Sequence, residues 1–323
     1  MVKHRGDNIC GVLLLDKPSE RSSNFYLQRI KYLFNAKKAG HTGSLDPLAT
    51  GLLPICFGKA TCLSEYFLHS DKSYEAIIQF GVSTDSHDSD GDIVSVSDVE
   101  FSQHQFDQSL KKFIGDIEQT PPMVSALKHN GQPLYKLALK GQEIERKPRK
   151  MQVFSLAGVL LPDNQAKLTV HCSSGFYVRQ LTADLGEELG CGAHIKQLRR
   201  ISSKYLTIEN AIKFDDIEAK VNQFNDNAIN KQSYIQSILI EPDKLLKSLP
   251  AIEVGEQSAN DVSHGRKANF NHSQLQKTFS KDQHYRLYQR IDANQRHFLG
   301  IAEINSEGLL KVRRLFNKVL NKV

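Results

Sequence analysis

The apolar positions in the first 80 residues follow two strand patterns. Residues 11–15 form an uninterrupted apolar run that ends at Asp16-Lys17-Pro18, where proline interrupts strand hydrogen bonding. Residues 74–80 alternate between apolar and polar side chains, which places the apolar ones on a single strand face. The pattern therefore predicts a short buried strand followed, after about 60 residues, by a strand with one apolar face.

Helical spacing fills the interval between these strands. Apolar side chains recur over 27–34 at intervals of three and four residues, which predicts a helix. Ser22 or Ser23 is suited to cap its beginning, and Gly40 offers a stop. A second helix is predicted around 60–68.

The pattern between residues 100 and 200 predicts a mixture of helices and strands. The signals are a capping box at Ser102 and Gln105, a hairpin turn at Asn130-Gly131, strands at 153–161 and 168–172, and a helix over 178–189 closed by Gly190 or Gly192. The order has no regular βαβ period and no dinucleotide-type glycine fingerprint. We therefore predict an α+β fold built on a mixed sheet.

The pattern changes towards the end of the chain. Residues 223–234 are rich in Asn, Gln, Asp and Lys, and we expect a surface excursion near a domain boundary. Beyond Pro250 the chain has short alternating pieces, which suggest a small all-β module. We predict two domains, residues 1–245 and 246–323.

Composition narrows the class of protein. The 323 residues are 40% hydrophobic, which is ample for two globular domains, and contain no apolar run near the ~18 residues that span a bilayer. Five cysteines without a Cys-x-x-Cys pair, and an N-terminus without an apolar signal segment, indicate free thiols in a reducing cytoplasm. We expect no contact with a membrane.

The net charge of +6 is modest, but the basic residues are clustered. Such clusters suit either phosphate binding or a solvated surface, and the sequence leaves both open. The clusters are Lys37-Lys38, residues 146–150, Arg199-Arg200, and Lys311 with Arg313 and Arg314.

Three sites that resemble cofactor motifs lack essential residues. Residues 58–61 have no glycine at the position that a phosphate loop requires, and Ala60 replaces the hydroxyl that binds magnesium. Residues 86–97 have serine at the first and twelfth positions of a calcium loop, so we expect a solvated acidic loop. The histidines lack metal-ligand spacing. We expect neither a cofactor nor a metal.

The loop at residues 39–51 is the best candidate for chemistry. It holds a single carboxylate, Asp46, among three glycines, and Pro47 fixes the backbone dihedral directly after it. A rigidly aimed carboxylate suits a nucleophile. The alternative is a tight turn in which Asp46 bonds its own backbone.

Five ordered segments, 11–18, 40–51, 71–74, 175–179 and 192–200, closely resemble the TruB family of tRNA pseudouridine synthases. The resemblance implies a pseudouridine synthase fold, with a central, largely antiparallel sheet flanked by helices and a small C-terminal β-barrel of the PUA type. It implies isomerisation of the uridine at position 55 in the tRNA T-loop, without a cofactor. The implied partner is tRNA, through its T-loop and acceptor arm, and we expect a cytoplasmic monomer.

The resemblance also implies catalytic roles. Asp46 aligns with the family's catalytic aspartate, which attacks the ribose or the uracil ring or assists a ribose intermediate. Arg179 aligns with the arginine that pairs with this aspartate and opposes the cost of burying its charge. Tyr74 aligns with the tyrosine that stacks on the target base, and its hydroxyl is a candidate for helping to remove the C5 proton.

Further positions align with residues that bind the RNA. His41 matches a histidine that fills the space left by the extruded base, and Tyr177 and Leu198 match residues that line the uracil pocket. Lys17, like Lys37-Lys38, is expected to hold phosphates. The chain departs from the family pattern at Ser44, Cys62 and Phe176, and Cys62 replaces a lysine that is expected to contact RNA.

Two other functions fit parts of the pattern. An N-ribosyl hydrolase also places a carboxylate near an anomeric carbon, but it releases the free base. A tRNA-folding chaperone needs only RNA binding. The order of the bond-making steps and the identity of the C5 proton acceptor stay open.

Overall fold

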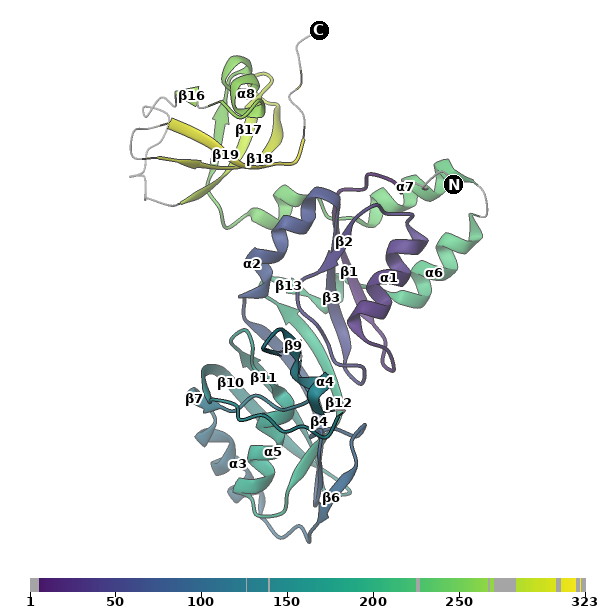
Figure 1. The fold of residues 1–323 in the computed structure, drawn as a ribbon, viewed down its shortest axis with the longest axis vertical. Coiled ribbons are helices and arrows are strands. Elements are labelled where there is room, and N and C mark those ends of the chain that lie inside the picture. The colour runs from purple at the N-terminus through teal and green to yellow at the C-terminus, as the bar shows by residue number, and fades with distance from the viewer. Residues whose placement is uncertain are drawn as a thin grey trace.

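A ten-stranded mixed sheet runs along the long axis of the molecule, and a separate five-stranded sheet lies beyond one of its ends (Figure 1). The computed structural model describes residues 6–125, 127–138, 140–224, 227–266, 268–269, 283–305, 309–317 and 320. The main sheet has the strand order β14-β1-β3-β12-β4-β11-β10-β7, with β2 paired to β3 and β13 paired to β12. Its strands are β1 Gly11–Lys17, β2 Ala39–His41, β3 Thr50–Phe57, β4 Lys72–Phe80, β7 Gly115–Gln119, β10 Arg149–Leu161, β11 Gln165–Cys172, β12 Ala193–Ser203, β13 Leu206–Thr207 and β14 Ile212–Lys213.

The pairing within this sheet is antiparallel except between β1 and β14 and between β3 and β12. This confirms the predicted mixed, largely antiparallel sheet. Both strand predictions are also confirmed. The whole of β1 is buried apart from Asp16, and alternate residues of β4, from Lys72 to Phe80, face the interior.

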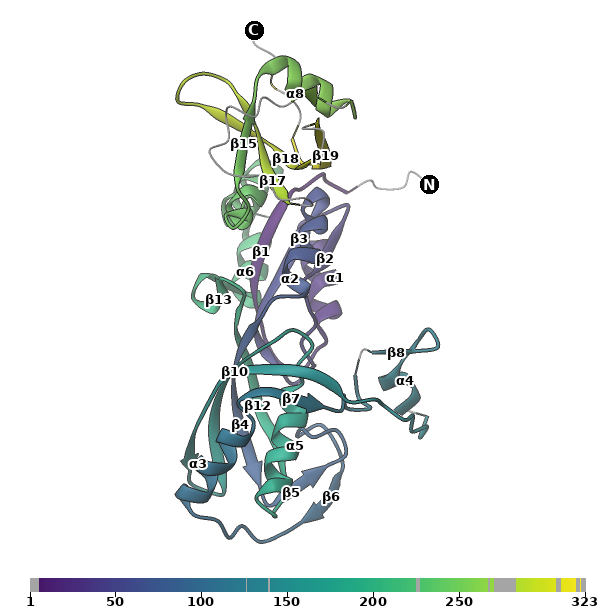
Figure 2. The ribbon, with the colours of Figure 1, turned by 90° about the vertical axis from the view of Figure 1, so that its left-hand side faces the viewer.

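Four of the helices that share one hydrophobic core with the main sheet contribute Ile30, Phe106, Leu181 and Ile217 to it. They are α1 Ser23–Leu33, α3 Gln103–Lys112, α5 Val178–Glu188 and α6 Phe214–Gln223. Helices α1 and α6 lie along the β1 half of the sheet, and α5 lies against β12 in the β4 half (Figure 2).

Most predicted helix ends match the structure. Ser22 caps α1 by accepting a hydrogen bond from the Phe25 backbone, and Ser102 and Gln105 form the predicted capping box of α3. The expected stop at Gly40 is wrong, because Gly40 lies in β2. The chain instead leaves α1 through Asn35, whose φ of 50° lies in the left-handed region.

Two other helix predictions need only small changes. The segment predicted at 60–68 begins as a 3₁₀ helix, η1 Gly58–Leu63, and continues as α2 Ser64–Leu68. After α5, the chain turns through Gly190, with a φ of 75°, and the Gly192 backbone N–H donates to the Gly186 carbonyl.

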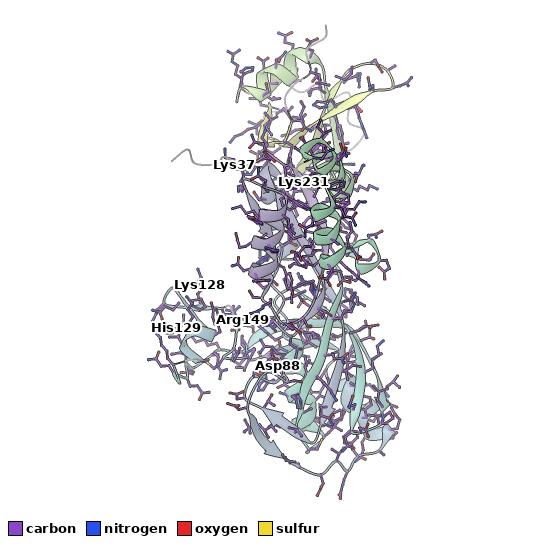
Figure 3. The ribbon with its side chains drawn as sticks, turned by 90° about the vertical axis from the view of Figure 1, so that its right-hand side faces the viewer. Lys37, Asp88, Lys128, His129, Arg149 and Lys231 are labelled. Atoms are coloured by element: carbon purple, nitrogen blue, oxygen red, sulfur yellow. The ribbon has the colours of Figure 1, made fainter. Side chains whose placement is uncertain are left out.

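Two excursions from the main sheet flank the Asp46 loop. The first is the hairpin β5 Val82–Thr84 and β6 Ile93–Val96. The second projects from the body between β7 and β10 (Figures 2 and 3), and contains β8 Lys128–His129, β9 Gln132–Pro133 and α4 Leu134–Ala138. The predicted Asn130-Gly131 hairpin is confirmed, with both residues at positive φ.

The polar stretch at 223–234 is more regular than expected. It contains the last residue of α6 and the first half of α7 Ala228–Ile238, which lies against the end of α1 and the start of β1 (Figure 1). Ile235 is buried, whereas Ile229 is 78% exposed. The helix is therefore hard to recognise from its hydrophobic pattern.

The C-terminal domain has its own core, which includes Leu287, Leu299 and Leu310. Its elements are β15 Ala251–Val254, α8 Glu256–Ser263, β16 Ala268–Asn269, β17 His284–Arg290, β18 Arg296–Ile304 and β19 Leu309–Leu315, with the strand order β15-β17-β18-β19-β16. The expectation of an all-β module is wrong because α8 is present. In the part of this domain that the structure describes, β15 and β16 are not paired, so the sheet does not close into the expected barrel.

A third hydrophobic cluster joins the two sheets. Val12 and Leu52 of the main sheet pack in it with Tyr288, Phe298 and Phe316 of the C-terminal domain. The predicted boundary between residues 245 and 246 falls in the 3₁₀ helix η3 Pro242–Leu246, whose two leucines belong to the same cluster.

Candidate active site

The Asp46 loop links β2 to β3 and lies over the centre of the main sheet. Gly51, at the start of β3, has a φ of 101°, and a Cβ there would lie 2.3 Å from the Arg200 carbonyl oxygen on β12. Glycine thus allows the loop to rejoin the sheet in close contact with β12. Beyond Asp46, the Ala49 backbone N–H donates to the Asp46 carbonyl, which forms a turn.

Two buried cations bind carbonyl groups of this loop. Arg200, which is 1% exposed, donates to the carbonyl oxygens of Gly43 at 3.1 Å, Ser44 at 3.4 Å and Leu52 at 2.7 Å. Lys17, with no exposed surface, donates to Pro18 at 2.7 Å, Arg21 at 2.9 Å and Pro47 at 3.4 Å. The expectation that Lys17 holds a phosphate does not fit this geometry, because its amine faces backbone carbonyls inside the protein.

Arg179 lies opposite the loop in the first turn of α5. Its Nε is 2.9 Å from Asp46 Oδ2, in an ion pair without good hydrogen-bond alignment. Its two other nitrogens donate to the carbonyl oxygens of Ser86 at 2.9 Å and Val124 at 2.7 Å. The Arg179 side chain is 4% exposed, so it is fixed by both excursions that flank the loop.

A second carboxylate shares this guanidinium. Asp88 Oδ2 lies 3.4 Å from Arg179 Nη1, and the side chain is 6% exposed. Its other oxygen accepts from the Ser86 hydroxyl at 2.5 Å and from the Asp90 backbone at 3.2 Å. The expectation of a solvated acidic loop is therefore wrong for Asp88, which is buried in the β5–β6 hairpin loop (Figure 3).

Burial and charge act on Asp46 in opposite directions. Its carboxyl group is 42% exposed through the mouth of the cleft, yet protein surrounds its other sides. Loss of hydration raises the pKa of Asp46, the Arg179 guanidinium lowers it, and Asp88 raises it further, with a net upward shift. The ion pair thus limits the shift and favours the ionised carboxylate that a nucleophile requires.

Five of the predicted site residues line one cleft of about 320 Å³: Asp46, Tyr74, Tyr177, Arg179 and Leu198. Tyr74 is 9% exposed on β4, directly across from Arg200 on β12, and burial raises its pKa. Burial also raises the pKa of Tyr177, whose backbone N–H and carbonyl are both bound by Gln119. Both phenols therefore stay neutral at pH 7.

His41 lies beside this cleft rather than in its lining. It is the last residue of β2, and its Nδ1 is buried without a hydrogen-bond partner. Burial, with the positive charge of Arg200 as a second cause, lowers the pKa of His41. At neutral pH the ring is therefore uncharged, which suits stacking against bases.

Sequence reasoning missed two residues of this site. Arg200 belongs to a basic cluster and to the matched segment 192–200, neither of which gives it a role of its own, and Asp88 belongs to a loop with failed calcium spacing. No signal in the isolated sequence shows that a charged side chain is buried by contacts from distant strands.

Among the described residues, no group of three or more His, Cys, Asp or Glu side chains is placed to hold a metal ion. None of the described helices has the length and apolar character needed to cross a membrane.

The fold is shared with solved structures of complexes that contain Cbf5. The chain superimposes on one from the Cbf5-Nop10-Gar1 complex with a TM-score of 0.68 and 23% identity, covering 95% of this chain and 85% of the other. A chain from the archaeal box H/ACA sRNP Nop10-Cbf5 complex gives a TM-score of 0.67 at 21% identity, covering 99% and 90%. At this level of identity the likeness concerns the fold alone.

Sequence comparison identifies the family. The family model of the TruB pseudouridylate synthase N-terminal domain matches residues 31–178, and two TruB C-terminal models match residues 179–247 and 250–316. A tRNA pseudouridine synthase B from Psychromonas ingrahamii is 40% identical over 97% of this chain and 98% of its own length. Another from Shewanella denitrificans is 41% identical over 97% and 96%. The chain belongs to the TruB family of pseudouridine synthases.

Proposed function

We propose that this protein isomerises uridine to pseudouridine in tRNA, at position 55 of the T-loop, with Asp46 as the nucleophile. The observation that carries the proposal is the Asp46–Arg179 ion pair at 2.9 Å, in a cleft that also contains Tyr74. Relatives at about 40% identity over nearly the whole chain are named tRNA pseudouridine synthase B.

The reaction conserves every atom of the nucleotide. The bond between uracil N1 and ribose C1′ breaks, a bond between uracil C5 and C1′ forms, C5 loses a proton and N1 gains one. Asp46 attacks the ribose or the uracil ring, or assists a ribose intermediate, and each route needs the ionised carboxylate that Arg179 favours. No electron transfer occurs, so side chains that hold and turn the base are sufficient.

The remaining cleft residues are suited to hold an extruded base. Tyr74 offers a ring on which uracil stacks, and Tyr177 and Leu198 close the pocket around it. We assign His41 to the space that the base leaves in the loop. Tyr74 is one candidate for helping to remove the C5 proton, since its hydroxyl group belongs to the same cleft.

Cations on both sides of the cleft support a long RNA contact. The projecting excursion carries exposed Lys128, Lys136 and Lys147, and Figure 3 shows Lys128 and Lys37 on the same side of the molecule. Near the domain junction, Lys38 and Arg314 both act electrostatically on Cys62. We infer that the T-loop lies over the cleft and that the acceptor arm reaches the junction.

We propose that the protein acts as a monomer in the cytoplasm, where a reducing environment suits its five free cysteines. The direct test is a map of reverse-transcription stops on carbodiimide-treated tRNA, incubated with and without the protein. We expect one new stop, at the T-loop uridine, with the RNA mass unchanged. An RNA that loses the mass of uracil indicates hydrolysis instead, and an unmodified RNA that is bound and refolded indicates a chaperone. Either result contradicts the proposal.

A further inference from the structure

The residue before Asp46 is held by a single hydroxyl group from another element. Ser23 Oγ accepts a hydrogen bond from the Leu45 backbone N–H at 2.7 Å, and it donates to the Leu45 carbonyl at 2.9 Å. Ser23 is 2% exposed and Leu45 is 5% exposed. One hydroxyl thus satisfies both backbone groups of a buried residue outside regular secondary structure.

This contact completes a set of side-chain bonds along the loop. Arg200 binds the carbonyls of Gly43 and Ser44, Ser23 binds both backbone groups of Leu45, and Lys17 binds the carbonyl of Pro47. Both cations can only donate to the loop, because neither has a lone pair with which to accept a hydrogen bond from a backbone N–H. Ser23 therefore also restrains a backbone N–H group, that of Leu45, which is the residue directly before Asp46.

Ser23 and Arg179 hold the Asp46 loop from opposite sides. Ser23 is the first residue of α1, whereas Arg179 lies in the first turn of α5, on the other side of the loop. The Asp46 carboxylate is 42% exposed and pairs with Arg179 from one side only. Arg179 holds one oxygen of the carboxylate, and Lys17 and the Ala49 turn restrain the backbone after Asp46, so Ser23 supplies the restraint on the backbone before it.

We propose that Ser23 is a positioning residue, which holds the Leu45–Asp46 backbone so that the Asp46 carboxylate meets both Arg179 and the target ribose or base. The inference rests on the proposed function of Asp46. Ser23 itself makes no contact with the substrate. Its hydroxyl couples the start of α1 to the geometry of the nucleophile.

The test is the variant Ser23→Ala, assayed by single-turnover kinetics on a T-arm RNA. A misplacement of the order of 1 Å lowers a catalytic rate by roughly 10²-fold, so we expect the rate constant to fall by about 10- to 100-fold. We expect RNA affinity to change less than threefold, roughly, because the hydroxyl lies outside the cleft lining. We also expect the acid limb of the rate profile to move to higher pH, because Asp46 is less firmly held beside Arg179.

The neighbouring serine provides a matched control. Ser22 caps the same helix by accepting from the Phe25 backbone at 3.2 Å, and among the described residues its hydroxyl forms no hydrogen bond to the Asp46 loop. We expect Ser22→Ala to lower the melting temperature and leave the rate constant and its pH profile unchanged. If Ser22→Ala and Ser23→Ala lower the rate equally, Ser23 acts only through helix stability and the inference is wrong.

A second pair of variants isolates the hydroxyl if Ser23→Ala folds poorly. Ser23→Thr and Ser23→Val have the same shape and differ only in that hydroxyl. We expect the Thr variant to react at least tenfold faster, and equal rates overturn the inference. An inactive Asp46→Asn together with a fully active Ser23→Ala contradicts the role of Ser23 alone, whereas an active Asp46→Asn contradicts the proposed function.

Discussion

Replacing Arg179 by glutamine removes the guanidinium that Asp46 and Asp88 share. Both carboxylates then lie close together without the guanidinium that they share, so the pKa of Asp46 rises above its already raised value. Reaction requires the carboxylate, so activity is lost as pH falls through this pKa. We therefore expect the acid limb of the Arg179→Gln profile at higher pH than that of the wild type.

The size of the effect follows from the distances and the exposure. An ion pair near 4 Å is worth about 1 kcal/mol in water and about 4 kcal/mol near a protein surface. Because Asp46 is 42% exposed, we take about 1–3 kcal/mol, which corresponds to roughly a 5- to 150-fold loss of rate on the acid limb of the profile. Loss of the bonds to Ser86 and Val124 also destabilises the fold, at the lower end of the about 3–5 kcal/mol typical of broken buried pairs.

The assay is a single-turnover rate profile between pH 5 and 9, with each variant checked for folding by urea unfolding. Asp88→Asn is the comparison, since it removes a negative charge that raises the pKa of Asp46, and we expect its acid limb at lower pH than that of the wild type. Arg179→Gln and Asp88→Asn profiles that shift in the same direction, or do not shift, would refute the electrostatic reasoning.

Other parts of the structure give three further expectations. Gly51→Ala forces a Cβ against the Arg200 carbonyl at positive φ, and we expect a loss of about 1–3 kcal/mol or more in urea unfolding; a neutral effect contradicts the close approach. Burial lowers the pKa of Lys17 to about 8, so between pH 8 and 10.5 the unfolded chain binds the extra proton and stability gains from rising pH. Lys17→Met should therefore show a smaller rise, or a steeper fall, than the wild type across this window, and parallel curves contradict the assignment. We expect Lys38→Gln and Arg314→Gln each to reduce the slope of log affinity against log salt concentration by roughly 0.7–0.9 for whole tRNA. The same slope for an isolated T-arm should stay unchanged. Equal effects on both RNAs contradict the acceptor-arm contact.

Local patterns determine much of the fold. The buried strand at 11–15, the alternation at 74–80 and the capping box at Ser102 were predictable because each signal acts within a few residues. The left-handed Asn35 and the exposed helix α7 were not, since one replaces an expected glycine and the other buries few apolar side chains. Closure of the C-terminal sheet was likewise beyond local patterns, because it depends on pairing between distant strands.

The residues of the site also fall into those that the sequence indicates and those that only the structure shows. Asp46 was recognisable from its glycine-rich loop, and resemblance to a family indicated Tyr74 and Arg179, which line the same cleft. The burial of Lys17 and Asp88 was not visible in the sequence. Charged side chains are ordinarily exposed, and only tertiary contacts, to loop carbonyls in one case and to Arg179 in the other, make their burial possible.

The central claim, that Asp46 acts as an ionised nucleophile, is tested most directly by release of tritium from C5 of uridine in a T-arm RNA. Asp46→Asn keeps the shape of the side chain and removes its charge. The account predicts wild-type RNA affinity and no tritium release above background for this variant. Tritium release at the wild-type rate by Asp46→Asn would contradict it.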